Sequence, residues 1–217
     1  MSRDTIARDF NAEAAVWDEK PARVKLAGEV AAAILEAAGL ARSAGELDVL
    51  DFGCGTGLVT LALQPFCRSV TGADTSSGML GALEAKAEKA GLRNVRTHQI
   101  DPENPQLPAG PFGLIVSSMT LHHVKQPGLT LAQLHAVSAP GGLVCLADLE
   151  PDGGLFHEDN AGVYHFGFDR EAMRELLASA GFTLASYETA ARVEKPAADG
   201  RTRDFGVFLA VGVNAPR

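Results

Sequence analysis

Short apolar runs alternate along the chain with longer segments in which apolar residues recur at helical spacing. The runs have the length of buried strands and lie at 47–52, 68–74, 94–100, 112–118 and 143–149. The segments with helical spacing lie at 22–39, 79–90, 129–138 and 169–180. Because strands and helices alternate, the pattern predicts an α/β fold around a doubly wound, mostly parallel sheet.

Two further strands are expected after the last of these helices, at 182–189 and 205–213. A charged loop over 192–203 is expected to join them, with no helix between. Such a pair is typical of a hairpin, so we expect a seven-stranded sheet with one antiparallel strand. The length of 217 residues and the hydrophobic content of 46% suit a single domain over 1–217.

Composition narrows the possible partners. The formal net charge of −8 argues against nucleic-acid binding, which needs a basic face to neutralise phosphates. Cys54, Cys67 and Cys145 show neither zinc nor iron–sulfur spacing, so no metal is predicted, and reduced thiols in a cytoplasmic protein are expected. The first residues lack a signal-peptide core and no apolar run reaches about 18 residues, which predicts no membrane span. Monomer and homodimer both stay open.

The most informative stretch is 47–60, which reads LDVLDFGCGTGLVT. An apolar strand ends at Asp51, glycines follow at alternate positions, and a helical pattern begins. Glycine permits the turn and a close approach of backbone to ligand, while the helix start leaves amide donors free. A nicotinamide-dependent oxidoreductase would have its third glycine where Leu58 stands. The acid at the strand end also suits a cation better than a phosphate.

The segment D-F-G-C-G-T-G resembles motif I of the class I S-adenosylmethionine (SAM) methyltransferases. In that family the acid and the glycines cradle the positively charged amino acid end of SAM. The resemblance implies a Rossmann-like class I methyltransferase fold, with SAM as cofactor and S-adenosylhomocysteine as product. It assigns cofactor binding to the following four residues: Asp51, Gly53, Gly55 and Gly57.

Three later residues are further candidates for the cofactor site. Asp74 ends the second predicted strand, where an acid accepts hydrogen bonds from both ribose hydroxyls, although it is also a good N-cap for the next helix. The resemblance places Met79 beside the adenine, with core packing as the alternative. It places Asp101 at the adenine amino group, although an aspartate before proline is also an ordinary turn residue.

The stretch 117–124, SSMTLHHV, resembles the small-molecule branch of the family, of the ubiquinone and menaquinone type. Pro140-Gly-Gly before a strand is another family hallmark, whereas Phe112-Gly113 departs from the usual Phe-Asp. The resemblance covers about residues 10–190. It implies transfer of a methyl group to a small acceptor by in-line displacement, in which the protein supplies mainly proximity and alignment.

Histidines are the candidates for a general base, because an unperturbed imidazole titrates near neutral pH. His122 and His123 follow the fourth strand, and His165 lies in a long polar loop at 151–168 that we expect to face the substrate. Candidate substrate contacts are His157 and Tyr164 in that loop, together with Trp17. The resemblance makes 1–45 a helical lid segment, with plain packing on the sheet as the alternative.

Three alternatives stay open at this point. One is a metal or polar cluster formed by Asp148, Glu150, His157, Asp159 and His165, since histidine and carboxylate ligands suit a divalent metal. Another is a SAM-binding regulatory protein without methyl transfer. The third is a protein methyltransferase, because the acceptor is not encoded in the motifs.

Overall fold

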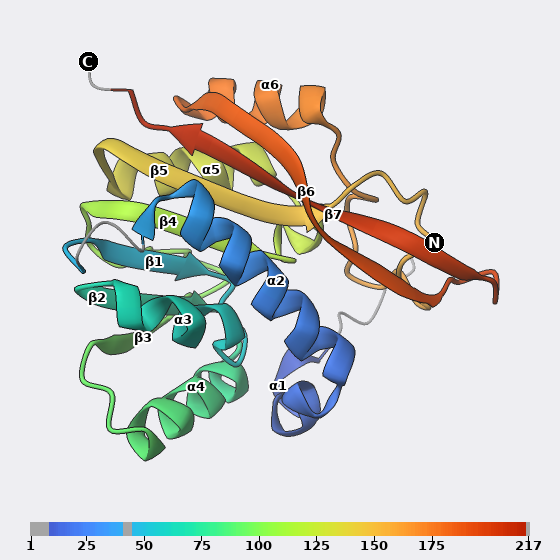
Figure 1. Ribbon diagram of the computed structural model, residues 1–217, viewed down its shortest axis with the longest axis horizontal. Coiled ribbons are helices and arrows are strands. Elements are labelled where there is room, and N and C mark those ends of the chain that lie inside the picture. The colour runs from blue at the N-terminus through green and yellow to red at the C-terminus, as the bar shows by residue number, and fades with distance from the viewer. Residues whose placement is uncertain (1–8, 41–44, 216–217) are drawn as a thin grey trace.

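Seven strands form one sheet in the order β3-β2-β1-β4-β5-β7-β6 in the computed structural model, which describes residues 9–40 and 45–215 (Figure 1). β7 runs antiparallel to both of its neighbours, and the other neighbouring pairs are parallel. The strands are β1 (Asp48–Phe52), β2 (Ser69–Asp74), β3 (Val95–Gln99), β4 (Phe112–Ser118), β5 (Ser138–Leu149), β6 (Thr183–Pro196) and β7 (Thr202–Val213). The expected fold class is confirmed.

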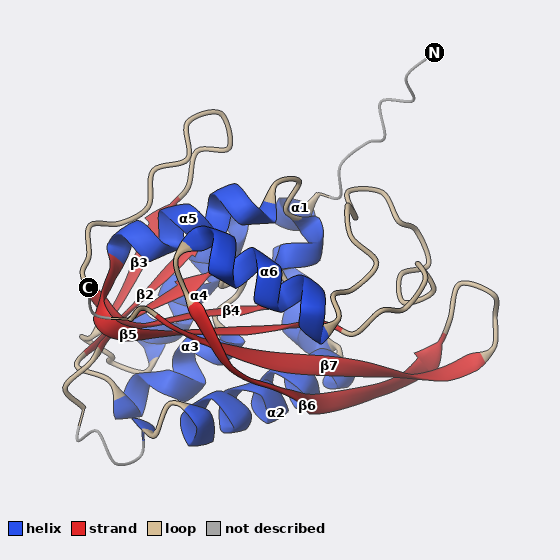
Figure 2. Ribbon diagram, turned by 90° about the horizontal axis from the view of Figure 1, so that it is seen from above, coloured by secondary structure: helices blue, strands red, loops and turns tan. Residues whose placement is uncertain are grey.

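Helices cover both faces of the sheet (Figure 2). They are α1 (Phe10–Glu13), α2 (Pro21–Ala37), α3 (Leu58–Leu63), α4 (Ser77–Lys89), α5 (Pro127–Val137) and α6 (Arg170–Ala180), with 3-10 turns η1 (Ala14–Glu19), η3 (Gln64–Phe66) and η4 (Leu121–His123). Successive residues of β1 face opposite layers: Val49 packs in the core under α2 and α3, and Leu50 in the core under α5 and α6. This alternation explains why the strand reads as a continuous apolar run.

The β6–β7 hairpin is longer than the sequence pattern predicted. The expected loop over 192–203 is wrong: most of it is strand, and Glu194 pairs with Asp204 within the ladder. Figure 2 shows the two strands running beyond the rest of the sheet. Outside the sheet neither face of the hairpin is fully covered, so charged and polar residues alternate there and obscure the strand signal.

Two smaller boundaries also bear on the prediction. β5 begins at Ser138 rather than at 143, because the Pro140-Gly-Gly segment continues the strand through a shift in its register with β4. The predicted start of the helix near 169 is confirmed, since the Asp169 carboxylate caps α6 by accepting a hydrogen bond from the amide of Ala172 at 2.8 Å.

Candidate functional site

The glycine turn after β1 lies at the carboxyl edge of the sheet. Gly53, Gly55 and Gly57 have φ values of 72°, 53° and 83°, a region that side chains rarely adopt. A β-carbon at Gly53 would overlap the side chain of Thr120, which comes from the loop after β4. A β-carbon at Gly55 would meet no atom within 4 Å, so the turn borders open space at that residue.

Asp51 lies beneath this turn and is 1% exposed. Its Oδ2 accepts a hydrogen bond from Thr60 Oγ1 on α3 at 2.5 Å. Burial raises the pKa of the Asp51 carboxyl to about 7, and the negative charge of Asp74 adds to the increase. A cationic group bound at the turn would favour the ionised form of this carboxyl.

Asp74 ends β2 directly beside the turn. Its Oδ2 accepts from the amide of Gly55 at 2.8 Å, and its Oδ1 accepts from the amide of Ser76 at 2.9 Å. The N-cap of α4 is Ser76, whose hydroxyl accepts from the Met79 amide, so the capping alternative for Asp74 is wrong. Each Asp74 oxygen keeps a further lone pair, which is what two ribose hydroxyls require.

The two candidates for the adenine side differ in their surroundings. Met79 is 2% exposed in the first turn of α4, which favours the core-packing alternative. Asp101 is exposed after β3 and accepts from the amide of Glu103 at 2.9 Å, as a turn aspartate does. The adenine contacts of both residues stay predictions.

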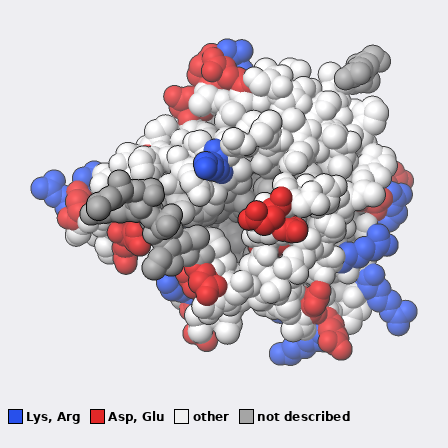
Figure 3. All heavy atoms as spheres, turned by 180° about the vertical axis from the view of Figure 1, so that it is seen from behind, with Lys and Arg blue, Asp and Glu red and all other residues white. Residues whose placement is uncertain are grey.

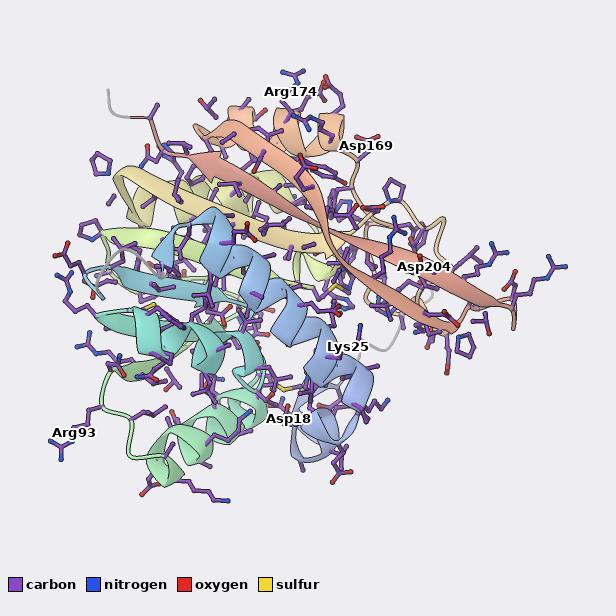
Figure 4. All side chains as sticks on the ribbon, in the orientation of Figure 1. Asp18, Lys25, Arg93, Asp169, Arg174 and Asp204 are labelled. Carbon is purple, nitrogen blue, oxygen red and sulfur yellow. The ribbon has the colours of Figure 1, made fainter. Side chains whose placement is uncertain are left out.

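The N-terminal segment is tied to the cofactor side of this edge. Asn11 Oδ1 accepts from the Ser76 hydroxyl and from the amide of Gly78 at the start of α4, at 2.8 Å each. Asp18, between η1 and α4 in Figure 4, accepts from Thr56 Oγ1 at 2.6 Å and pairs with Lys86 at 2.7 Å. The segment therefore closes over the glycine turn. Residues 1–8 and 41–44 of the expected lid lie outside the described residues.

The same segment also reaches the acceptor side. The ring of Phe10 lies 5.5 Å from that of His123 in an edge-on contact. Trp17 lies 6.0 Å from Phe10 and carries the Arg23 guanidinium over its ring at 3.6 Å. A substrate contact of Trp17 stays a prediction, because the indole is already covered by Arg23.

Behind Thr120, the 3-10 turn η4 presents His122 to the carboxyl end of β5. His122 is 1% exposed, and its Nδ1 lies 2.7 Å from Oδ1 of the fully buried Asp148. Asp148 also accepts from the amides of His122 at 3.3 Å and Leu149 at 2.7 Å. The Nε2 atom of His122 has no hydrogen-bond partner among the described residues.

Two more imidazoles lie against His122. The ring of His123 is 4.1 Å from it and that of His157 is 5.1 Å from it, measured between ring centroids. One ring nitrogen from each residue lies within 4.8 Å of the others. The Nδ1 atom of His123 is 2.8 Å from the carbonyl oxygen of Gly162. We call His122, His123 and His157 the histidine cluster.

The long connection after β5 is held in place by the hairpin extension. Phe156 packs edge-on against Phe205 of β7, and Lys195 of β6 donates to the Phe156 carbonyl at 2.7 Å. His157 follows directly and is thereby brought to the cluster. The connection therefore covers η4, and the Tyr164 amide donates to the His122 carbonyl at 2.9 Å.

The other candidates in this connection point elsewhere. His165 Nε2 is 3.0 Å from the carbonyl of Val124, and Tyr164 is 54% exposed. Of the expected polar cluster, only Asp148 and His157 come together, through His122. Glu150 instead accepts from Thr189 of β6 at 2.5 Å, and the Asp159 carboxylate accepts from the amide of Ala161 at 2.9 Å. That five-residue cluster is wrong as a single site.

Sequence reasoning missed the residues that hold the site together. Thr60, Thr120, Asn11, Asp18 and Phe156 each contact a candidate site residue or the glycine turn across a long sequence separation. Their residue types are common at surfaces and in loops, so the sequence carried no signal for them. On the face drawn in Figure 3, basic and acidic side chains are interspersed among the described residues, with no broad basic region. None of the described helices has the length and apolar character needed to cross a bilayer.

Comparison with known proteins agrees with this geometry. A family model described as "Methyltransferase domain" matches residues 22–187. An uncharacterised methyltransferase of Schizosaccharomyces pombe is 28% identical over 154 residues, which cover 64% of this chain and 54% of the relative. A ubiquinone biosynthesis O-methyltransferase of Caulobacter vibrioides is 30% identical over 159 residues, covering 66% and 62%. The chain thus spans roughly half the length of these curated relatives.

Solved structures show the same fold. A chain from the complex of the Haloferax volcanii Trm112 methyltransferase activator with a putative methyltransferase superposes with a TM-score of 0.73 at 22% identity, covering 98% of this chain and 100% of that chain. The YcgJ protein of Bacillus subtilis gives a TM-score of 0.71 at 15% identity, covering 87% and 99%. Because the family model spans most of the sequence and the predicted motifs lie at one edge of the observed sheet, the chain belongs to the class I SAM-dependent methyltransferase family.

Proposed function

We propose that this chain transfers a methyl group from SAM to a small-molecule acceptor. The observation that carries the proposal is that the glycine turn and the histidine cluster meet at one edge of the sheet. Thr120 joins them: its hydroxyl lies 3.3 Å from the Gly53 carbonyl oxygen, and His122 follows two residues later. A cofactor half and an acceptor half are thus side by side.

The residues of the cofactor half fit SAM. The open space at Gly55 lets backbone approach a ligand, and Asp74 has lone pairs left for ribose hydroxyls. The buried Asp51 carboxyl offers a negative charge to the cationic end of the cofactor. When bound, SAM supplies a methyl group activated by its sulfonium.

The residues of the acceptor half position the acceptor and receive its proton where it has one. Asp148 holds the His122 ring by its Nδ1 atom, so the Nε2 atom faces the cluster and is free to accept a proton. The connection over 151–168 and Phe10 cover this space and restrict it to small acceptors. Such a cover favours a small molecule over a protein chain, and an organised acceptor half favours an enzyme over a regulatory SAM-binding protein.

Calorimetric titration of the purified protein with SAM, S-adenosylhomocysteine and NAD tests the cofactor. We expect binding of SAM and its product and none of NAD. NAD binding alone would overturn the proposal. A screen of small phenols, thiols and amines, with S-adenosylhomocysteine formation as readout, then tests the acceptor class. Turnover only with protein acceptors would replace the small-molecule reading.

A further inference from the structure

We propose that His122, His123 and His157 bind one divalent transition-metal ion, with Zn²⁺ as the best match, and that its open coordination position takes the hydroxyl or thiol of the acceptor. The second half of this proposal rests on the proposed function; the metal site itself does not. The starting observation is that one ring nitrogen from each histidine lies within 4.8 Å of the other two.

Two of the rings are fixed in the form that binds metals. The Gly162 carbonyl oxygen can only accept, so the Nδ1 atom of His123 carries the proton and Nε2 keeps its lone pair. The Asp148 carboxylate accepts from Nδ1 of His122 in the same way. A histidine that donates its other ring nitrogen to a carboxylate or a carbonyl is the usual arrangement around a protein-bound metal.

Burial gives the second argument. His122 is 1% exposed, and its Nε2 atom has no hydrogen-bond partner among the described residues, yet it points toward the other two rings. Asp148 is fully buried as well. A buried carboxylate with a buried imidazole acceptor is costly unless a positive charge lies nearby. A divalent ion at the cluster satisfies the Nε2 lone pair and compensates the charge of Asp148.

The ligand set selects the type of metal. Three neutral imidazoles suit Zn²⁺, Co²⁺, Ni²⁺ or Cu²⁺, whereas Mg²⁺ and Ca²⁺ prefer oxygen ligands. Tetrahedral zinc with nitrogen ligands at about 2.0–2.1 Å needs ligand atoms roughly 3.4 Å apart. Small ring rotations bring atoms within 4.8 Å to that separation, and the half-buried His157 lies on a connection that can follow. Three histidine ligands leave one tetrahedral position open, as in catalytic zinc sites.

The open position would activate the acceptor. Its oxygen or sulfur donates a lone pair to the ion, which lowers the pKa of the O–H or S–H group, and the proton leaves to solvent. The resulting anion forms a bond to the methyl carbon, while the carbon–sulfur bond of the cofactor breaks and its electron pair stays on the neutral thioether. The ion then replaces an imidazole as the group that allows deprotonation.

Calorimetric titration of the full-length, EDTA-treated protein with Zn²⁺ tests the metal site. We expect one ion per chain. His157→Ala and His123→Ala should each weaken binding by roughly 100-fold or more, and Asp148→Asn by roughly 10–100-fold. His98→Ala is the matched control, because His98 is engaged with the Gln106 carbonyl on β3 outside the cluster, and it should bind zinc normally. Zinc affinity that is equal in His157→Ala and the unaltered protein would overturn the site.

The open position needs its own measurement. With Co²⁺ in place of Zn²⁺, addition of azide, a small anion that ligates cobalt, should change the visible spectrum; an unchanged spectrum would overturn the open position. SAM titration of the same samples keeps the two proposals apart. SAM binding without zinc binding refutes the metal site alone, and zinc binding without SAM binding refutes the proposed function alone. Retained SAM binding in His157→Ala also shows that the variant is folded.

Discussion

The buried carboxyl of Asp51 makes a pH dependence of stability that can be worked out from the structure. The perturbation is Asp51→Asn, which keeps the size of the side chain and an oxygen for the Thr60 hydroxyl. Burial raises the pKa of Asp51 from 3.8 to about 7, so the folded protein holds this proton to a higher pH than the unfolded chain does. Stability from the protonated carboxyl is therefore lost as the pH rises between these two values.

The magnitude follows from the two pKa values. A separation of about three pH units corresponds to about 4 kcal/mol of unfolding free energy above pH 8. About 3 kcal/mol of this falls between pH 5 and pH 8.5, because the unfolded chain is already ionised at pH 5. Relative to Asp51→Asn, the unaltered protein should lose that amount across the range.

Urea unfolding of both proteins at several pH values, without ligand, measures the difference. Asp48→Asn on the same strand is the matched control. The hydrogen bond and charge of Arg68 lower the pKa of Asp48 to about 2, so its contribution is lost only below about pH 4 and stays constant in the measured range. Unfolding curves of Asp51→Asn that run parallel to those of the unaltered protein would refute the reasoning.

Three more predictions concern the cofactor half. Asp74→Asn should weaken SAM binding in calorimetry by roughly 10–100-fold, because a charge-assisted hydrogen bond contributes about 1.5–3 kcal/mol; unchanged affinity would exclude its ribose role. Gly53→Ala should lower the unfolding free energy by about 2–4 kcal/mol in urea titration, since its φ is 72° and its methyl would overlap Thr120, and a loss no greater than that of Gly55→Ala would contradict this. Asp18→Ala should speed proteolysis within residues 10–20 by about fivefold, as the loss of a partly exposed ion pair of up to about 1 kcal/mol implies, and an unchanged rate would show that the segment is held elsewhere.

The cofactor half was predictable from the sequence because its signals are local. The glycines follow Asp51 on one short turn, and Asp74 ends the next strand, so parallel strand order alone brings them to one edge. Helix ends were predictable for the same reason, as Asp169 and its capping bond show. What local pattern could not give was the bonding of Asp74 to two backbone amides, which makes it a support of the turn as well as a ligand candidate.

The acceptor half was only partly predictable. The pair His122 and His123 stood out, but His157 joins them only because Phe156 packs on the outer end of β7. That outer end was predicted as a loop, since a hairpin beyond the sheet has no continuous apolar face. Asp148 was expected as a free acid at the strand end, and its full burial against His122 depends on packing that no sequence pattern encodes.

The N-terminal segment connects the two halves. Asn11 caps the helix beside the cofactor half, and Phe10, its chain neighbour, contacts His123 of the histidine cluster. A rigid pair of adjacent residues cannot move away from one half without disturbing the other. Entry of either ligand therefore requires one shared displacement, and the ligand that binds first lowers the cost of that displacement for the second. Cofactor and acceptor binding are expected to be positively coupled for this reason, and the coupling resides in this segment rather than in the sheet.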